Sequence, residues 1–207
     1  MLSEIRKYIY SAPSVRLSEL KASETVLVIV DMINGFVNEG ALASPRIKNI
    51  IPEVSELVSK CQKKNINIIA FADCHKENAV EFESFPVHCL ENTSESEIID
   101  EIKDKISAVI PKNSTNGFHA PEFQKLLEKN PQWENFIVCG DCTDICVHNF
   151  CITLKTYFNQ INRNSRIIVP LNAVETYDGG IHNADFMNLS ALMIMNTNGI
   201  ELAKEID

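Results

Sequence analysis

Apolar residues in this chain form short continuous runs, separated by longer stretches in which apolar residues recur every three or four positions. The short runs are rich in Val and Ile, which is typical of strands buried on both faces of a parallel sheet. Strands are therefore predicted at residues 26–30, 66–72, 107–110, 136–139 and 166–169, with a short sixth strand at 200–202. The helical spacing predicts helices at residues 45–64, about 94–105, 121–129, about 143–158 and about 181–195.

The alternation of strands and helices predicts an α/β fold. We expect a three-layer sandwich, with a mainly parallel, about six-stranded central sheet and helices on both of its faces. A chain of 207 residues can bury a full core, and no repeat or linker divides it, so residues 1–207 are expected to form one domain. Residues 1–24 are expected to be a peripheral arm that packs on the body or on a neighbouring chain.

The stretch from residue 134 to residue 151 contains the most informative cysteine. Gly140 is expected to end the strand before it, and Thr143 or Asp144 to cap the following helix. Cys146 would then lie in the first turn, where free N–H groups and the positive end of the helix dipole favour a thiolate. The same N–H groups could hold an oxyanion. A buried core cysteine is the alternative interpretation.

Reactive side chains stand at the ends of four predicted strands, and these ends share one edge of a parallel sheet. They are Asp31, the pair Asp73 and His75, Lys112, and Cys146 just beyond its strand. Asp31 near a thiol could take its proton, and Lys112 would favour the charged forms of both groups. The alternatives are a turn-capping Asp31 and a solvated Lys112.

A second group of residues has the donor types of a metal site. Asp73 and His75 are two positions apart, His88 adds an imidazole, and Glu81 or Glu83 could add a carboxylate. Two imidazoles with carboxylates suit one divalent ion, with zinc favoured and iron or manganese as alternatives.

Composition limits the partners and the compartment. The net charge of −9 argues against nucleic acid and against anionic membrane surfaces. No apolar run approaches the ~20 residues that span a bilayer, and no secretory signal is seen at the N-terminus. Seven cysteines without such a signal favour reduced thiols in the cytoplasm. Cys139 and Cys142 form a lone CxxC, so a redox protein that uses them with Cys146 is a further alternative.

Four blocks of this sequence resemble the isochorismatase-like cysteine hydrolases in order and spacing. They lie between residues 28 and 147 and read VIVDMINGF, FADCHKENAVEFESFPVH, VIPKNSTNGF and GDCTDICV. The resemblance implies a catalytic triad of Asp31, Lys112 and Cys146. It also implies an oxyanion hole made by the backbone N–H groups of Cys142 and Cys146.

The second block resembles the nicotinamidase branch of that family. This implies a divalent metal bound by Asp73, His75 and His88, with Glu81 as a further ligand unless a loop shift brings in Glu83. The resemblance also implies that Phe36 and Phe85 flank a pyridine ring. A later aromatic position falls on either Phe118 or His119.

The activity implied by the resemblance is hydrolysis of nicotinamide to nicotinate and ammonia. Nicotinamidases commonly carry DxQxDF, whereas Asp31 is followed here by MINGF, which lacks the Gln and the second Asp. The alternatives are therefore a related hydrolase of another small amide or ureido compound, and a non-catalytic member that binds a ligand. The expected partners are a small amide and further copies of the same chain.

Overall fold

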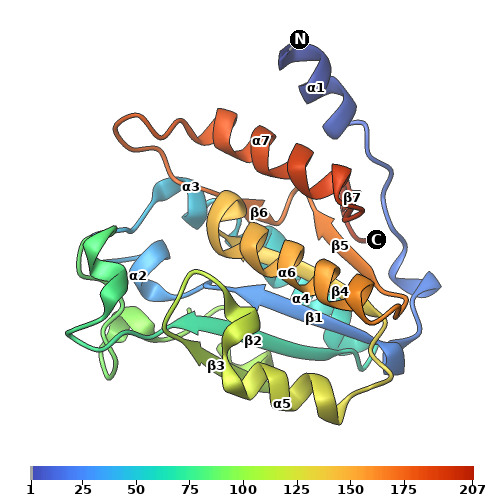
Figure 1. Cartoon of the computed structure of the whole chain (residues 1–207), viewed down its shortest axis with the longest axis horizontal. Helices are drawn as coiled ribbons and strands as arrows, with labels where there is room; N and C mark the ends of the chain where they lie inside the picture. The colour runs from blue at the N-terminus through green and yellow to red at the C-terminus, as the bar shows by residue number, and fades with distance from the viewer. Residues whose placement is uncertain (1) are drawn as a thin grey trace.

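A sheet of parallel strands forms the centre of the protein, whose computed structural model describes residues 2–207 (Figure 1). In the described chain this sheet has seven strands, and its main path runs β3-β2-β1-β4-β5-β7, with β6 beside β4. The strands are β1 (Thr25–Val30), β2 (Asn67–Asp73), β3 (Ala108–Lys112), β4 (Asn135–Asp141), β5 (Arg166–Pro170), β6 (Val174–Glu175) and β7 (Glu201–Ala203). The predicted fold class is confirmed, with β6 as the strand that the hydrophobic pattern missed.

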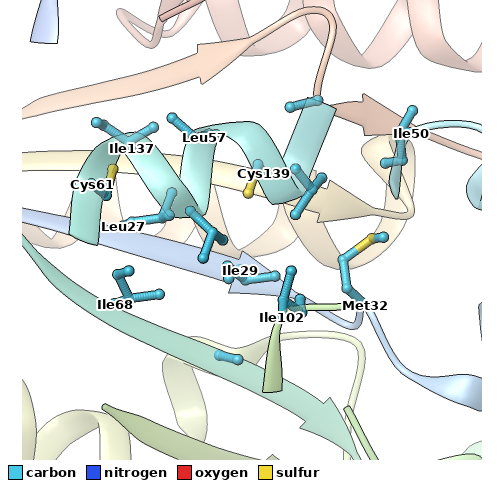
Figure 2. Packing of buried hydrophobic residues seen from close by; sticks show 14 of the residues in the cluster. Leu27, Ile29, Met32, Ile50, Leu57, Cys61, Ile68, Ile102, Ile137 and Cys139 are labelled. Carbon is cyan, nitrogen blue, oxygen red and sulfur yellow. The ribbon is translucent and has the colours of Figure 1, made fainter. Parts of the chain in front are cut away.

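The first face of the sheet is covered mainly by α4 (Ile51–Lys63). Figure 2 shows Leu57 and Cys61 of this helix in one cluster with Leu27 of β1 and Ile137 of β4. All of these side chains are nearly or fully buried. Removing them from water is the main driving force for this layer, at roughly 1.5–3 kcal/mol for each large aliphatic side chain.

The second face is covered by α5 (Pro121–Lys129), α6 (His148–Gln160) and α7 (Ala184–Thr197). Aromatic rings join these helices to the sheet. The ring of Phe71 on β2 lies 5.4 Å from Phe123 of α5 and 5.0 Å from Phe150 of α6, both edge to face. Such pairs add roughly 0.5–1.5 kcal/mol beyond the burial of their area.

One predicted helix is divided in the structure, and another is absent. The helix expected at 45–64 is divided into α3 (Pro45–Lys48) and α4, because Pro52 has no N–H to continue the helical ladder across the break. The helix expected at 94–105 is absent, and two short turns, Ser94–Ser96 and Lys103–Lys105, lie there instead. Between them the backbone pairs with the segment after β1, since Ile99 donates to the carbonyl of Met32 over 3.1 Å.

Two strand ends also differ from prediction. Gly140 does not end β4 but lies inside it, with a φ of 108° that favours glycine. A Cβ at this position would overlap the carbonyl oxygen of Val30 on β1, so the close approach of the two strands requires glycine. Lys112 is likewise the last residue of β3 rather than a residue beyond it.

The N-terminal segment packs on the body through α1 (Leu2–Ile9), which lies beside α7 in Figure 1, and through the buried Val15, Leu17 and Leu20. Tyr8 donates to Asn196 of α7 over 3.1 Å, and Val15 forms a bridge with Ile206 near the C-terminus. The predicted arm at 1–24 therefore contacts this chain itself, with Met1 outside the described residues. Among residues 2–207, no helix has both the length and the apolar character needed to cross a bilayer.

Candidate functional site

The site lies where the strand order changes direction. After β1 the chain adds β2 and β3 on one side, and β4 then returns to the other side of β1. Loops that leave β1 and β4 diverge at such a point and leave a crevice at the carboxyl ends of the strands. Asp31 follows β1 directly, with a left-handed φ of 54°, and is fully buried. A non-glycine residue held in that region is a local strain of the kind found at functional sites.

Lys112 connects the carboxylates of this crevice. It pairs in register with Asp73, and its Nζ donates to Asp73 Oδ1 and lies 2.8 Å from Asp31 Oδ2. The backbone N–H of Asp73 donates to the other oxygen of Asp31 over 3.0 Å. Lys112 is only 3% exposed, so the alternative of a solvated lysine is wrong.

Cys146 completes this cluster, with its Sγ 3.5 Å from Lys112 Nζ. Burial raises the pKa of the thiol well above its ordinary range, and the attraction of Lys112 opposes that only in part. Burial likewise raises the pKa of Asp31 to about 6, against the attraction of Lys112. The cluster therefore places the Cys146 thiol beside a carboxylate that is ionised at neutral pH and beside a lysine whose attraction favours the thiolate.

The segment around Cys146 differs from the predicted helix start. Cys146 lies in a π-helical turn, Thr143–Val147, that precedes α6. Neither Thr143 nor Asp144 caps it, because the buried Thr143 hydroxyl has no partner among residues 2–207 and Asp144 binds His182. Cys142 immediately precedes this turn. The backbone N–H groups of the first residues of the turn have no partner within the helix, as at any helix start.

A cleft of about 430 Å³, counting its open mouth, reaches this cluster. Phe36 and Phe85 both line it, as do Cys142 and Cys146. Neither Phe118 nor His119 lines it, and Phe118 packs instead against Phe123 of α5 and Tyr157 of α6.

The four expected metal ligands gather at one side of the cleft. One donor atom from each of Asp73, His75, Glu81 and His88 lies within 4.8 Å of the others. His75 Nε2 is 3.5 Å from Asp73 Oδ1 and 3.8 Å from Glu81 Oε1. Glu83 is exposed, so the structure places Glu81 and not Glu83 beside the imidazoles.

The groups around these imidazoles fit a metal site. His75 Nδ1 is 2.8 Å from Asn113 Oδ1, and His88 Nδ1 is 2.8 Å from the carbonyl oxygen of Pro86. Both acceptors require a proton on Nδ1, which leaves the Nε2 lone pairs directed at the carboxylates. Among the described residues, His75 Nε2 is buried without a hydrogen-bond partner, as expected of an atom that would bind an ion.

The redox alternative finds no support in the geometry. Cys139 is fully buried in the core cluster that α4 covers (Figure 2), whereas Cys142 lines the cleft. Burial raises the pKa of Cys139 far above its ordinary range, which opposes thiol exchange.

Three residues of the site escaped the sequence analysis. Asn113 holds His75, while Asp141 and Tyr177 line the cleft. Asp141 is fully buried, burial raises its carboxyl pKa well above the ordinary range, and its Oδ2 has no partner in the described chain. Asn113 follows Lys112 and Asp141 precedes Cys142 in the sequence. This proximity to predicted site residues was the only feature of the sequence that pointed to them. Tyr177 stands in no recognisable motif.

Known proteins resemble this chain in sequence and in fold. A family model described as the isochorismatase domain matches residues 25–198. Nicotinamidase 1 of Arabidopsis thaliana is 28% identical over 179 residues, which cover 79% of this chain and 71% of that protein. The pyrazinamidase of Pyrococcus horikoshii, solved in complex with zinc, is 26% identical, with a TM-score of 0.71 and coverage of 86% of this chain and 98% of that chain.

A third relative shows the fold alone. The N-carbamoylsarcosine amidase of Thermoplasma acidophilum superposes with a TM-score of 0.73 at 24% identity, covering 89% of this chain and 99% of that chain. Since the isochorismatase match spans most of the sequence, the chain belongs to the isochorismatase family.

Proposed function

We propose that the protein is a cysteine amidohydrolase of small amides and that nicotinamide is its substrate. The observation that carries this proposal is the position of Lys112, whose Nζ contacts the Asp31 carboxylate and the Cys146 sulfur in one buried cluster. A thiol, a base and a fixed positive charge are the parts that acyl transfer through a thioester requires. The nicotinamidase relative supports the choice of substrate.

The reaction would proceed in two stages. Cys146 Sγ attacks the amide carbon while its proton passes to Asp31, and the carbonyl oxygen gains negative charge near the backbone N–H groups of Cys142 and Cys146. The C–N bond then breaks, and Asp31 returns the proton to the leaving ammonia. A water molecule next gives a proton to Asp31 and attacks the thioester carbon. The C–S bond then breaks, Asp31 returns that proton to the Cys146 sulfur, and the acid leaves.

Asp73, His75, Glu81 and His88 would hold one divalent ion, with zinc favoured by the donor types. When bound there, the ion supplies a Lewis-acid site for a ring nitrogen of the substrate. Phe36 and Phe85 would contact the ring, because both line the cleft and lie 5.8 and 6.2 Å from the ring of His88. These residues orient the substrate and leave the attack itself to Cys146.

Ammonia release from a panel of small amides tests the proposal. Purified zinc-loaded protein should release ammonia from nicotinamide, and a Cys146→Ala protein should not. Hydrolysis of another amide with no effect on nicotinamide would move the substrate to the ureido or aliphatic class and keep the cysteine mechanism. Absence of ammonia from every amide would favour a binding protein.

Two further expectations belong to this proposal. The cytoplasmic location stays a prediction, which cell fractionation would test. The homo-oligomer stays a prediction, and light scattering of the purified chain would test it.

A further inference from the structure

The segment between β6 and α7 carries a side chain of the cleft that the proposed mechanism does not use. Residues 176–183 leave β6 and turn sharply, with Gly179 and His182 donating to each other's carbonyls over 3.0 and 2.8 Å. Gly180, with a φ of 55°, allows this turn. Tyr177 at the start of the segment lines the cleft together with Cys142, Ile145 and Cys146.

The ring of Tyr177 is fixed by His182. The two rings stack face to face, with centroids 4.0 Å apart and planes at 3°. His182 Nδ1 is also 2.8 Å from the carbonyl oxygen of Tyr177 itself. With one face of the phenol ring covered by His182, its other face and its edge are the parts left to line the cleft.

His182 is in turn held by the segment around Cys146. Its Nε2 is 2.8 Å from Asp144 Oδ2, and the Asp144 side chain is only 5% exposed. Asp144 belongs to the same π-helical turn as Cys146, two residues before it. The two ring nitrogens of His182 thus lie beside the Tyr177 carbonyl oxygen and the Asp144 carboxylate, which hold the ring from both sides.

Tyr177 lies on a different side of the cleft from the two phenylalanines. Phe36 and Phe85 both approach His88 of the metal set, whereas Tyr177 is joined through His182 to the residues around Cys146. A substrate whose far end points toward His88 and whose carbonyl lies at Cys146 would therefore meet Tyr177 near its reacting group. A planar ring conjugated to the amide presents a flat surface there, and a branched aliphatic amide does not.

We propose that Tyr177 contacts the substrate and selects planar ring amides, and that Asp144 and His182 are positioning residues for it. The inference rests on the proposed amide hydrolysis for the identity of the ligand. It concerns recognition rather than bond cleavage, so binding and turnover can be measured separately.

Calorimetric titration of Cys146→Ala protein with nicotinamide and with isobutyramide, both with zinc present, tests the contact. Adding Tyr177→Ala should weaken nicotinamide binding by about 3- to 10-fold, as expected for loss of one aromatic contact, and isobutyramide binding by less than twofold. Tyr177→Phe should bind both amides as the parent does. Tyr8→Ala, at an exposed tyrosine of α1, is the matched control. Equal losses for both amides, or no loss of nicotinamide binding, would overturn the inference.

The positioning role has its own test. Asp144→Ala removes the acceptor of His182, whereas Asp144→Asn keeps an oxygen there and should rescue nicotinamide binding. If Asp144 acts through Tyr177, adding Asp144→Ala to Tyr177→Ala should cause no further loss of binding. Fully additive losses would refute the coupling. Nicotinamide that binds in this Tyr177-dependent way, with no ammonia released by wild type, would reject the proposed hydrolysis and keep the inference.

Discussion

Replacing Lys112 with Met is the sharpest test of the buried charge cluster. Met has a similar length and no charge, so it leaves the Asp31 and Asp73 carboxylates without the ammonium that contacts both. All three side chains are at most 2% exposed, and water therefore cannot screen the two negative charges. We expect folded protein with no hydrolytic activity and a large loss of stability.

The expected loss follows from the burial of these groups. Breaking a buried ion pair by removing one partner typically costs about 3–5 kcal/mol. For a chain of 150–250 residues, 1 kcal/mol shifts the Tm by roughly 2–4 °C. The Tm of metal-free Lys112→Met should therefore fall by about 6–20 °C at pH 8.

The pH dependence of this loss has a definite sign. Without the attraction of Lys112, the folded-state pKa of Asp31 rises further above its unfolded value and the pKa of Asp73 also rises, so the folded state binds more protons as the pH falls. The free energy of unfolding that Lys112→Met loses relative to wild type should be largest at pH 8 and shrink toward pH 5. Urea unfolding at both pH values measures this, with Lys48→Met at an exposed position as control. A deficit that is equal at both pH values, or below 1 kcal/mol, would refute the buried charge cluster.

Three further predictions concern the reaction. Cys146→Ala should abolish ammonia release without a large change in the free energy of unfolding. Cys142→Ala should reduce ammonia release much less, because the proposed contribution of Cys142 is a backbone N–H. Near-full activity of Cys146→Ala would rule out the thioester. His75→Ala should lose bound zinc, measured by elemental analysis, and most nicotinamide turnover, while iodoacetamide still labels Cys146; a metal-free wild type with full activity would contradict this. Because burial raises the pKa of Asp31 to about 6, kcat/KM should fall about tenfold per pH unit below that value, and a flat profile down to pH 5 would exclude Asp31 as the base.

The sequence was sufficient to place the reactive groups on one edge of the sheet. Asp31 and Asp73 follow or end buried runs, Lys112 ends the edge strand β3, and the parallel order then brings them together. The choice between Glu81 and Glu83 could not be made from spacing alone. It depends on the turn at residues 80–83 and on the bond from the Thr115 N–H to Glu81 Oε2, which joins segments far apart in the chain.

The predictions that failed were local rules overridden by tertiary contacts. Ile98, Ile99 and Ile102 have helical spacing, yet this segment pairs its backbone with residues 32–34 instead. Asp144 has the composition of a helix cap, but its carboxylate binds His182 from a segment almost 40 residues later. A propensity worth about 1 kcal/mol is easily outweighed by such contacts.

Asp73 links the two halves of the site. One of its oxygens accepts from Lys112 and also lies 3.5 Å from His75 Nε2, so the same carboxylate faces the proposed triad and the proposed metal ligands. Its backbone N–H, moreover, holds Asp31. Asp73→Asn should therefore reduce metal binding and nucleophile reactivity together, whereas His75→Ala should reduce metal binding alone. The comparison of zinc content with the rate of Cys146 alkylation in these two proteins separates the roles, and unchanged alkylation in Asp73→Asn would show that the two halves are independent.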